Sequence, residues 1–291
     1  MHVRVNGTRL WFDVDGPGLV PEGDTMRERP TVVLLHGGPG SFDHSYLKPD
    51  FSRLAGVAQV IYLDVRDHGR SEWGDPERWS PAACGDDVRA FCDALGIVKP
   101  VVYGHSLGGF LALHYATRHP GHPGGLVLDS TFARFDAGRL VENIRRLGGD
   151  ALADVAERVY FGTGPVTREE WAPVWKLFGR NVITMQERAR TVVNVSLNER
   201  ALPLMRTFDV VGELGRIECP TLILVGEKDP GTPVDAAREI FDGLRPKIRR
   251  LEVIEGAGHF LWRDAAKAYW PIVEEFVREV AGLGLDRSVQ A

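Results

Sequence analysis

The chain has 291 residues, of which 44% are hydrophobic and 26% charged, with 33 Gly and 18 Pro. This composition is typical of a globular enzyme and excludes a disordered or collagen-like protein. The net charge is −5 and no basic block occurs, so we expect no nucleic-acid partner. The 3 Cys have no C-x-x-C spacing and provide neither a disulfide framework nor a zinc ribbon. With no signal-peptide pattern and no long apolar run, we expect a soluble, cytoplasmic protein with no membrane partner and a small-molecule substrate.

The first residues predict a β-hairpin, because the short segments 3–5 and 10–14 are separated by Asn6-Gly7, a two-residue turn signal. Apolar runs follow at 31–35, 57–63, 100–103, 125–128, 221–225 and 249–254, and helical stretches separate most of them. Runs without polar alternation indicate burial on both faces, as in a parallel sheet covered by helices. The predicted class is α/β, with a mostly parallel sheet.

The alternation of strands and helices is interrupted once. Segments 136–146, 150–160, 168–178 and 186–194 are each typical of a short helix. We therefore predict a core domain of residues 1–130 and 215–291, and an inserted helical cap of residues 131–214. The insertion begins after a strand end, where open α/β sheets bind ligands, so we expect a lid. A lateral decoration is the alternative.

The candidate nucleophile is Ser106, in the sequence Gly104-His105-Ser106-Leu107-Gly108 between an expected strand and an expected helix. In a G-x-S-x-G turn, side chains at the two glycine positions would collide with neighbouring backbone, and the turn exposes the serine oxygen. A structural glycine-rich turn is the alternative. His105 adjoins the serine, but we expect its side chain to point the other way.

A serine hydroxyl needs a histidine base and a group that orients the base. Asp229 follows one predicted strand and His259 follows the next, so both lie at the ligand-binding edge of the sheet. Asp129, at the end of the predicted strand 125–128, is the alternative acid. Asp229 precedes a proline, and a loop-capping carboxylate is the competing explanation for it.

Acyl transfer also needs two hydrogen-bond donors for the oxyanion. We expect one to be the backbone N–H of Leu107, at the start of the helix, and the other that of Gly38, in the glycine-rich loop 36–40. A tight strand-to-helix turn is the alternative role for that loop. We expect no cofactor and no metal, because no H-E-x-x-H motif accompanies the histidines at 114, 119 and 122.

With these motifs the chain resembles the α/β-hydrolase superfamily, from the opening hairpin through His259. The segment 64–71 is similar to that superfamily's D-x-R-G-x-G-x-S loop, with Asp67 at the usual glycine, and we expect it to form ion pairs and a turn. The loop His-Gly-Gly-Pro-Gly resembles the prolyl iminopeptidase-like branch. That branch usually has G-G-S-W-G at the nucleophile, whereas G-H-S-L-G here is closer to esterases and lactonases.

The leading hypothesis is a serine hydrolase that cleaves a carboxylic ester, lactone or amide through an acyl-enzyme. A serine argues against the dehalogenases and epoxide hydrolases of the superfamily, which use an aspartate. An aminopeptidase that releases N-terminal proline is the first alternative. The resemblance implies acidic cap residues for the substrate amine, but Glu187, Glu199 and Glu213 cannot be aligned with them. The cap has 12 basic and 11 acidic residues, hence no acidic excess. A non-catalytic ligand-binding protein is the second alternative, and the oligomeric state cannot be predicted.

Overall fold

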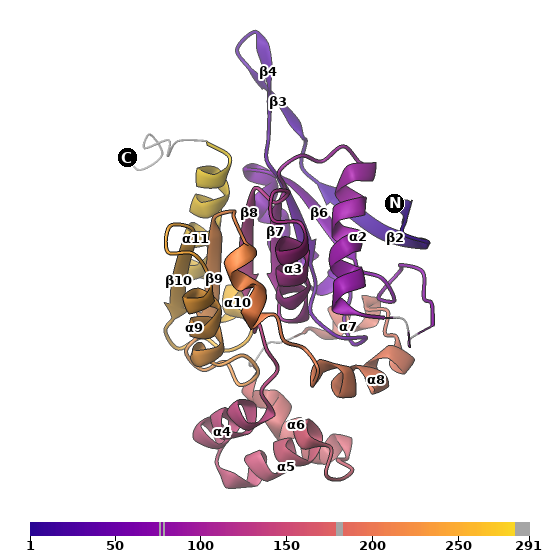
Figure 1. Cartoon of the computed structure of the whole chain (residues 1–291), viewed down its shortest axis with the longest axis vertical. Helices are drawn as coiled ribbons and strands as arrows, with labels where there is room; N and C mark the ends of the chain where they lie inside the picture. The colour runs from indigo at the N-terminus through magenta and orange to yellow at the C-terminus, as the bar shows by residue number, and fades with distance from the viewer. Residues whose placement is uncertain (76, 78, 179–182, 283–291) are drawn as a thin grey trace.

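The structure, a computed structural model, describes residues 1–75, 77, 79–178 and 183–282 (Figure 1). Its main sheet has eight strands in the order β1-β2-β6-β5-β7-β8-β9-β10. Strand β2 is antiparallel to β1 and β6, and every other neighbouring pair in this sheet is parallel. The predicted α/β class is confirmed. The bounds are β1 His2–Val5, β2 Thr8–Asp15, β5 Thr31–Leu35, β6 Gln59–Asp64, β7 Val101–His105, β8 Gly125–Asp129, β9 Thr221–Gly226 and β10 Arg249–Ile254.

The opening hairpin has the predicted turn. Asn6 and Gly7 both have positive φ, 46° and 74°, and Val5 pairs with Thr8 across them. This matches a two-residue turn whose twist suits the flanking strands.

Helices cover both faces of the sheet, which explains the continuous apolar pattern of the strands. In β5, Val33 and Leu35 pack in the core beneath α2, α3 and α9, whereas Val32 and Leu34 pack in the core on the other face, beneath α1 and α11. All four side chains are buried, so the strand needs apolar residues on both of its faces. The bounds are α1 Lys48–Phe51, α2 Pro81–Ala94, α3 Leu107–Arg118, α9 Val234–Gly243, α10 Leu261–Asp264 and α11 Ala266–Val280, with the 3₁₀ helices η1 His44–Tyr46, η2 Ser52–Gly56 and η4 Val211–Arg216.

Between β8 and β9 the chain forms further helices, of which α4, α5 and α6 extend beyond one end of the sheet (Figure 1). Their bounds are α4 Ala137–Gly148, α5 Asp150–Phe161, α6 Arg168–Leu177, α7 Met185–Arg190 and α8 Val195–Met205. These helices lie within residues 131–214, the predicted cap, whose boundaries stay a prediction.

The predicted helix 186–194 is wrong at its end. Helix α7 ends at Arg190, and Thr191 already has extended backbone. Asn194 instead begins helix α8, because its side chain accepts a hydrogen bond from the Leu197 N–H at 3.1 Å. An asparagine at this position caps a helix start rather than ending a helix. The sequence analysis did not predict α8.

A second hairpin, β3 Leu19–Glu22 with β4 Thr25–Glu28, projects from the end of the molecule opposite α4–α6 (Figure 1). Its residues are mostly exposed and lack apolar alternation, so the sequence pattern did not indicate it. Within the described residues, no helix is long and apolar enough to cross a bilayer.

Candidate active site

Ser106 occupies a strained turn between β7 and α3. Its φ of 55° and ψ of −120° lie outside the regions that non-glycine residues usually adopt. A Cβ at Gly104 would overlap the carbonyl of Gly108, and a Cβ at Gly108 would overlap the carbonyl of Leu35. These overlaps agree with the steric argument made from the sequence. The Ser106 N–H donates to the Asp129 carbonyl at 2.9 Å, which ties the turn to β8.

The loops after β9 and β10 bring Asp229 and His259 together. His259 Nδ1 lies 2.8 Å from Asp229 Oδ2. Asp229 is 1% exposed and also accepts hydrogen bonds from the N–H groups of Gly231 and Thr232 and from the Thr232 hydroxyl, at 2.6–2.9 Å. Burial alone would raise the pKa of Asp229, but the His259 ring and these donors outweigh it and lower that pKa. The carboxylate therefore stays ionised beside the ring.

Asp129, the alternative acid, has different partners. Its Oδ2 accepts hydrogen bonds from the hydroxyls of Tyr103 at 2.6 Å and Tyr269 at 2.7 Å. Burial raises the pKa of Asp129 to about 6, and the two hydroxyls offset only part of the effect. Among the described residues, Asp229 and not Asp129 is hydrogen-bonded to the His259 ring.

Gly38 and Leu107, the residues of the two expected oxyanion donors, lie close to each other. A Cβ built on Gly38 would lie 3.3 Å from Leu107 Cδ2. Among the described residues, no group accepts a hydrogen bond from the N–H of Gly38 or Leu107. The neighbouring amides are occupied, because Gly37 donates to the Tyr46 hydroxyl at 2.7 Å and Gly40 donates to His68 Nε2 at 2.9 Å.

Ser106, His259 and Gly38 line a cavity of about 180 Å³. The Ser106 hydroxyl forms no hydrogen bond with another described residue, which leaves it available to a ligand. None of the described lining residues is an aspartate, glutamate, lysine or arginine. Eight of the described lining residues are Phe, Tyr or Trp: Phe42, Phe132, Phe135, Tyr160, Trp171, Trp175, Phe178 and Phe260.

The three glutamates considered as partners of a substrate amine do not line this cavity. Glu187 is buried in an ion pair with Arg263, at 2.7 Å. Burial would raise its pKa, but the guanidinium and the Thr184 N–H outweigh that and lower the pKa of Glu187. Glu199 and Glu213 are exposed. None of the three lines the cavity.

The start of α8 rests on the glycine-rich loop, a contact that the sequence analysis missed. The Asn194 N–H donates to the Gly40 carbonyl at 2.9 Å, and Asn198 Nδ2 donates to the Pro39 carbonyl at 3.0 Å. Of the two asparagines, only Asn198 makes this contact through its side chain, and Asn194 uses its backbone N–H, which no sequence pattern reveals.

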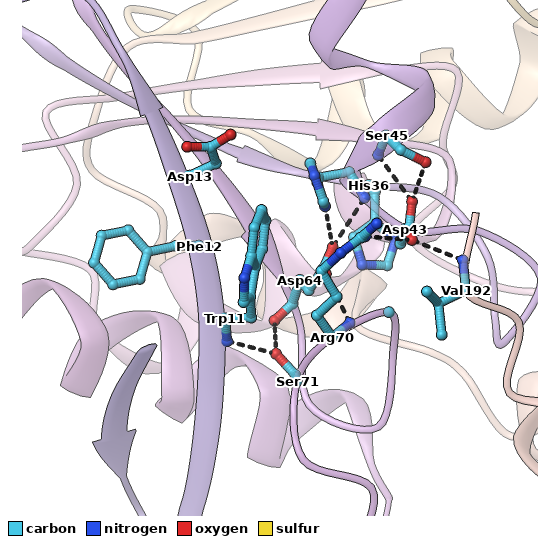
Figure 2. A network of polar contacts seen from close by, with 12 residues as sticks. Trp11, Phe12, Asp13, His36, Asp43, Ser45, Asp64, Arg70, Ser71 and Val192 are labelled. Atoms are coloured by element: carbon cyan, nitrogen blue, oxygen red, sulfur yellow. Dashed lines mark hydrogen bonds and ion pairs between the residues drawn. The ribbon is translucent and has the colours of Figure 1, made fainter. Parts of the chain in front are cut away.

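A polar network lies beside this loop (Figure 2). Asp64 accepts hydrogen bonds from the N–H groups of His44 and Arg70, each at 2.9 Å, and Arg70 Nη1 donates to Asp43 at 3.1 Å. Asp43 also accepts from the Val192 N–H at 2.8 Å, which connects the network to the segment between α7 and α8.

Atoms of Asp43, His44 and Asp64 lie within 4.8 Å of one another, as metal ligands would. Their oxygens already accept protein hydrogen bonds, and the Arg70 guanidinium adjoins them, so this set fits a structural role better than a metal site. Asp67, at the family's usual glycine, has a φ of 63°, the conformation that glycine tolerates best.

His105 departs from expectation. It does not point away from the site: its Nε2 lies 3.1 Å from the His259 carbonyl, and it lines the cavity. The loop after β10 folds over the end of β7 and brings the two residues together, which local sequence does not reveal.

Comparisons with known proteins agree with this architecture. The alpha/beta hydrolase fold family matches residues 30–165. A proline iminopeptidase of Saccharolobus solfataricus is 27% identical and covers 87% of this chain and 86% of the relative. A pimeloyl-[acyl-carrier protein] methyl ester esterase of Neisseria meningitidis is 29% identical, with 84% and 92% covered.

Among solved structures, proline iminopeptidase from Mycobacterium smegmatis superposes with a TM-score of 0.74 at 23% identity, covering 96% of this chain and 98% of that one. At this identity the likeness shows the fold. The family match, the relatives and the fold agree: the chain has the α/β-hydrolase fold and is similar to the proline iminopeptidases.

Proposed function

We propose that the protein is a serine hydrolase that cleaves an uncharged carboxylic ester through an acyl-enzyme, with an aromatic or other apolar group of the substrate in the cavity. The observation that carries this proposal is the aromatic cavity, whose described lining includes Ser106 and His259 and has no carboxylate. Apolar walls with a few polar groups favour a neutral, largely hydrophobic ligand.

In the proposed reaction, Ser106 Oγ attacks the carbonyl carbon while His259 Nε2 takes the hydroxyl proton. The N–H groups of Gly38 and Leu107 stabilise the oxyanion, and Asp229 keeps the His259 proton on Nδ1. His259 then returns the proton to the leaving alcohol. A water molecule, deprotonated by His259, hydrolyses the acyl-enzyme and restores Ser106.

The proline iminopeptidase activity named for relatives is the second candidate, supported by those relatives and by the loop His36-Gly37-Gly38-Pro39-Gly40. That reaction requires the cavity to accept a cationic amine. Without a carboxylate partner, a buried ammonium group would lose its hydration at a cost of several kcal/mol. The described lining offers no such partner, so the ester hypothesis is favoured.

The test compares kcat/KM for a short-acyl aryl ester with that for proline arylamide, and a fluorophosphonate probe reports the nucleophile by mass spectrometry. We expect modification at Ser106 and an ester preference beyond about 10³, since an ester is intrinsically easier to cleave. Comparable or faster release of proline would make the aminopeptidase the answer. A folded protein without labelling or turnover would favour a binding function.

A further inference from the structure

Three hydrogen bonds in series join separate loops of the candidate active site. The Gly37 N–H lies 2.7 Å from the Tyr46 hydroxyl oxygen, which lies 2.8 Å from His105 Nδ1. His105 Nε2 lies 3.1 Å from the carbonyl oxygen of His259. Gly37, Tyr46, His105 and His259 are all buried, so bulk water does not compete for these bonds.

The direction of each bond follows from chemistry. A carbonyl oxygen only accepts, so His105 Nε2 carries a proton and donates to His259. Burial and the neighbouring His259 ring hold the pKa of His105 well below its usual range, so the ring is neutral and Nδ1 is an acceptor. Tyr46 therefore donates to Nδ1, and its oxygen accepts from the Gly37 N–H. One set of proton positions satisfies the whole series.

Two members of the series directly precede groups of the proposed reaction in the chain, and a third, His259, is the proposed base. Gly37 precedes Gly38, the expected oxyanion donor, and His105 precedes Ser106. Packing around Gly37 is close: a Cβ there would lie 3.1 Å from the Tyr46 hydroxyl and 3.3 Å from both His105 Nδ1 and Ser106 Cβ. A displacement of Tyr46 or His105 would therefore move the oxyanion loop relative to the nucleophile.

We propose that Tyr46 and His105 are positioning residues that hold the Gly38 amide and the His259 loop in register with Ser106. The inference rests on the proposed serine hydrolase function. Oxyanion donors act at 2.7–3.1 Å from the developing charge, and a misplacement of about 1 Å can cost about 10²-fold in rate. The cost falls on the transition state, so KM changes little.

The first test removes one hydroxyl. Tyr46→Phe should lower kcat about 10- to 100-fold with KM within about threefold. Its inhibition constant for phenylboronic acid, which forms a tetrahedral adduct with serine, should rise by the same factor as kcat falls. Tyr62→Phe is the matched control. The Tyr62 hydroxyl donates to Asp15 at 2.9 Å and forms no hydrogen bond with a residue of the series, so this variant should keep the kcat of the wild type.

The outcomes separate the two proposals. A wild-type protein that fluorophosphonate does not label at Ser106 overturns the proposed function and this inference with it. If the wild type is labelled and folded Tyr46→Phe keeps wild-type kcat and boronate affinity, only the inference is overturned.

A second test covers the case in which Tyr46→Phe does not fold. His105→Gln retains an amide that can donate to the His259 carbonyl, whereas His105→Leu retains no polar group. We expect the glutamine variant to keep at least about threefold more kcat than the leucine variant. In the wild type, long-range ¹H–¹⁵N spectra of labelled histidines should show the Nε2–H tautomer for His105. The Nδ1–H tautomer would contradict the series, whatever the variants do.

Discussion

Glu187 of α7 forms a bidentate ion pair with Arg263 of α10, with Oε1–Nη2 at 2.7 Å and Oε2–Nη1 at 3.2 Å. Their side chains are only 8% and 11% exposed. Arg263 follows His259 by four residues and also donates to the Tyr46 carbonyl at 3.0 Å. Helix α7 of the predicted cap is thus tied to α10, the helix that directly follows the loop of the proposed base.

Replacing Glu187 by Gln should therefore destabilise the fold, because Arg263 loses a buried ion-pair partner. Removing one member of a buried pair typically costs about 3–5 kcal/mol, and we expect about 1–3 here because Asp50 still contacts Arg263. Urea unfolding measures this loss. Glu213→Gln, which removes an exposed pair with Arg216, should cost less than about 0.5 kcal/mol.

The loss should also depend on pH. The pKa of Glu187 is lowered in the folded state, so its stabilising effect is complete above the ordinary glutamate pKa of 4.5 and disappears as pH falls through the lower, folded value. The stability gap between wild type and Glu187→Gln should shrink with acidification below that pH. A gap independent of pH would contradict the role of the charge.

Ser106→Ala should abolish turnover while the melting temperature changes little. The substitution removes only the hydroxyl, and that group forms no hydrogen bond with another described residue. Residual activity above about 1% of the wild type, measured with aryl esters, would remove Ser106 from the role of nucleophile.

The two candidate acids should separate in activity. Asp229→Asn should lower kcat by up to about 10⁴, because an asparagine favours the wrong tautomer of the His259 ring. Asp129→Asn should stay within about tenfold of wild type, since Asp129 bonds Tyr103 and Tyr269 instead. A larger loss at Asp129 would transfer the assignment.

Asp129 has a separate effect on stability. Its pKa is raised to about 6 from 3.8, so the folded state loses stability as pH rises between these values and remains penalised above them. Asp129→Asn removes this penalty. Between pH 4 and pH 8, the stability of the variant relative to wild type should rise by up to about 3 kcal/mol, at about 1.4 per pKa unit. A relative stability that falls with pH would refute the burial effect.

Gly40→Ala should lower the stability of the fold by more than the strain of its positive φ alone would. Gly40 has a φ of 68°, and a Cβ there would lie 2.6 Å from both Asn194 O and Asn198 N at the start of α8. Gly7→Ala is the control, with a φ of 74° and nothing within 4 Å of the added Cβ. The control should cost about 1–2 kcal/mol from the angle alone. If thermal unfolding showed equal losses of stability for the two variants, α8 would have moved to accommodate the added methyl group, contrary to this prediction.

The sequence by itself determined much of the fold and the candidate nucleophile turn. The strands of the parallel sheet are buried on both faces, and this environment favours unbroken apolar runs such as residues 32–35 of β5. The opening turn at Asn6-Gly7 and the turn around Ser106 have local steric requirements that only particular residues meet. Such features are visible in one stretch of chain.

Tertiary structure decided which distant groups meet. Asp129 ends strand β8, and Asp229 lies in the loop that follows β9. The path of this loop brings Asp229 to His259, while Tyr269 of α11 helps to hold Asp129. From the sequence, Glu187 was a candidate partner for a substrate amine, but in the structure Arg263 pairs with it. The side chain of His105 was misjudged for the same reason. Contacts between residues far apart in sequence depend on the packing of whole elements, and no local pattern encodes them.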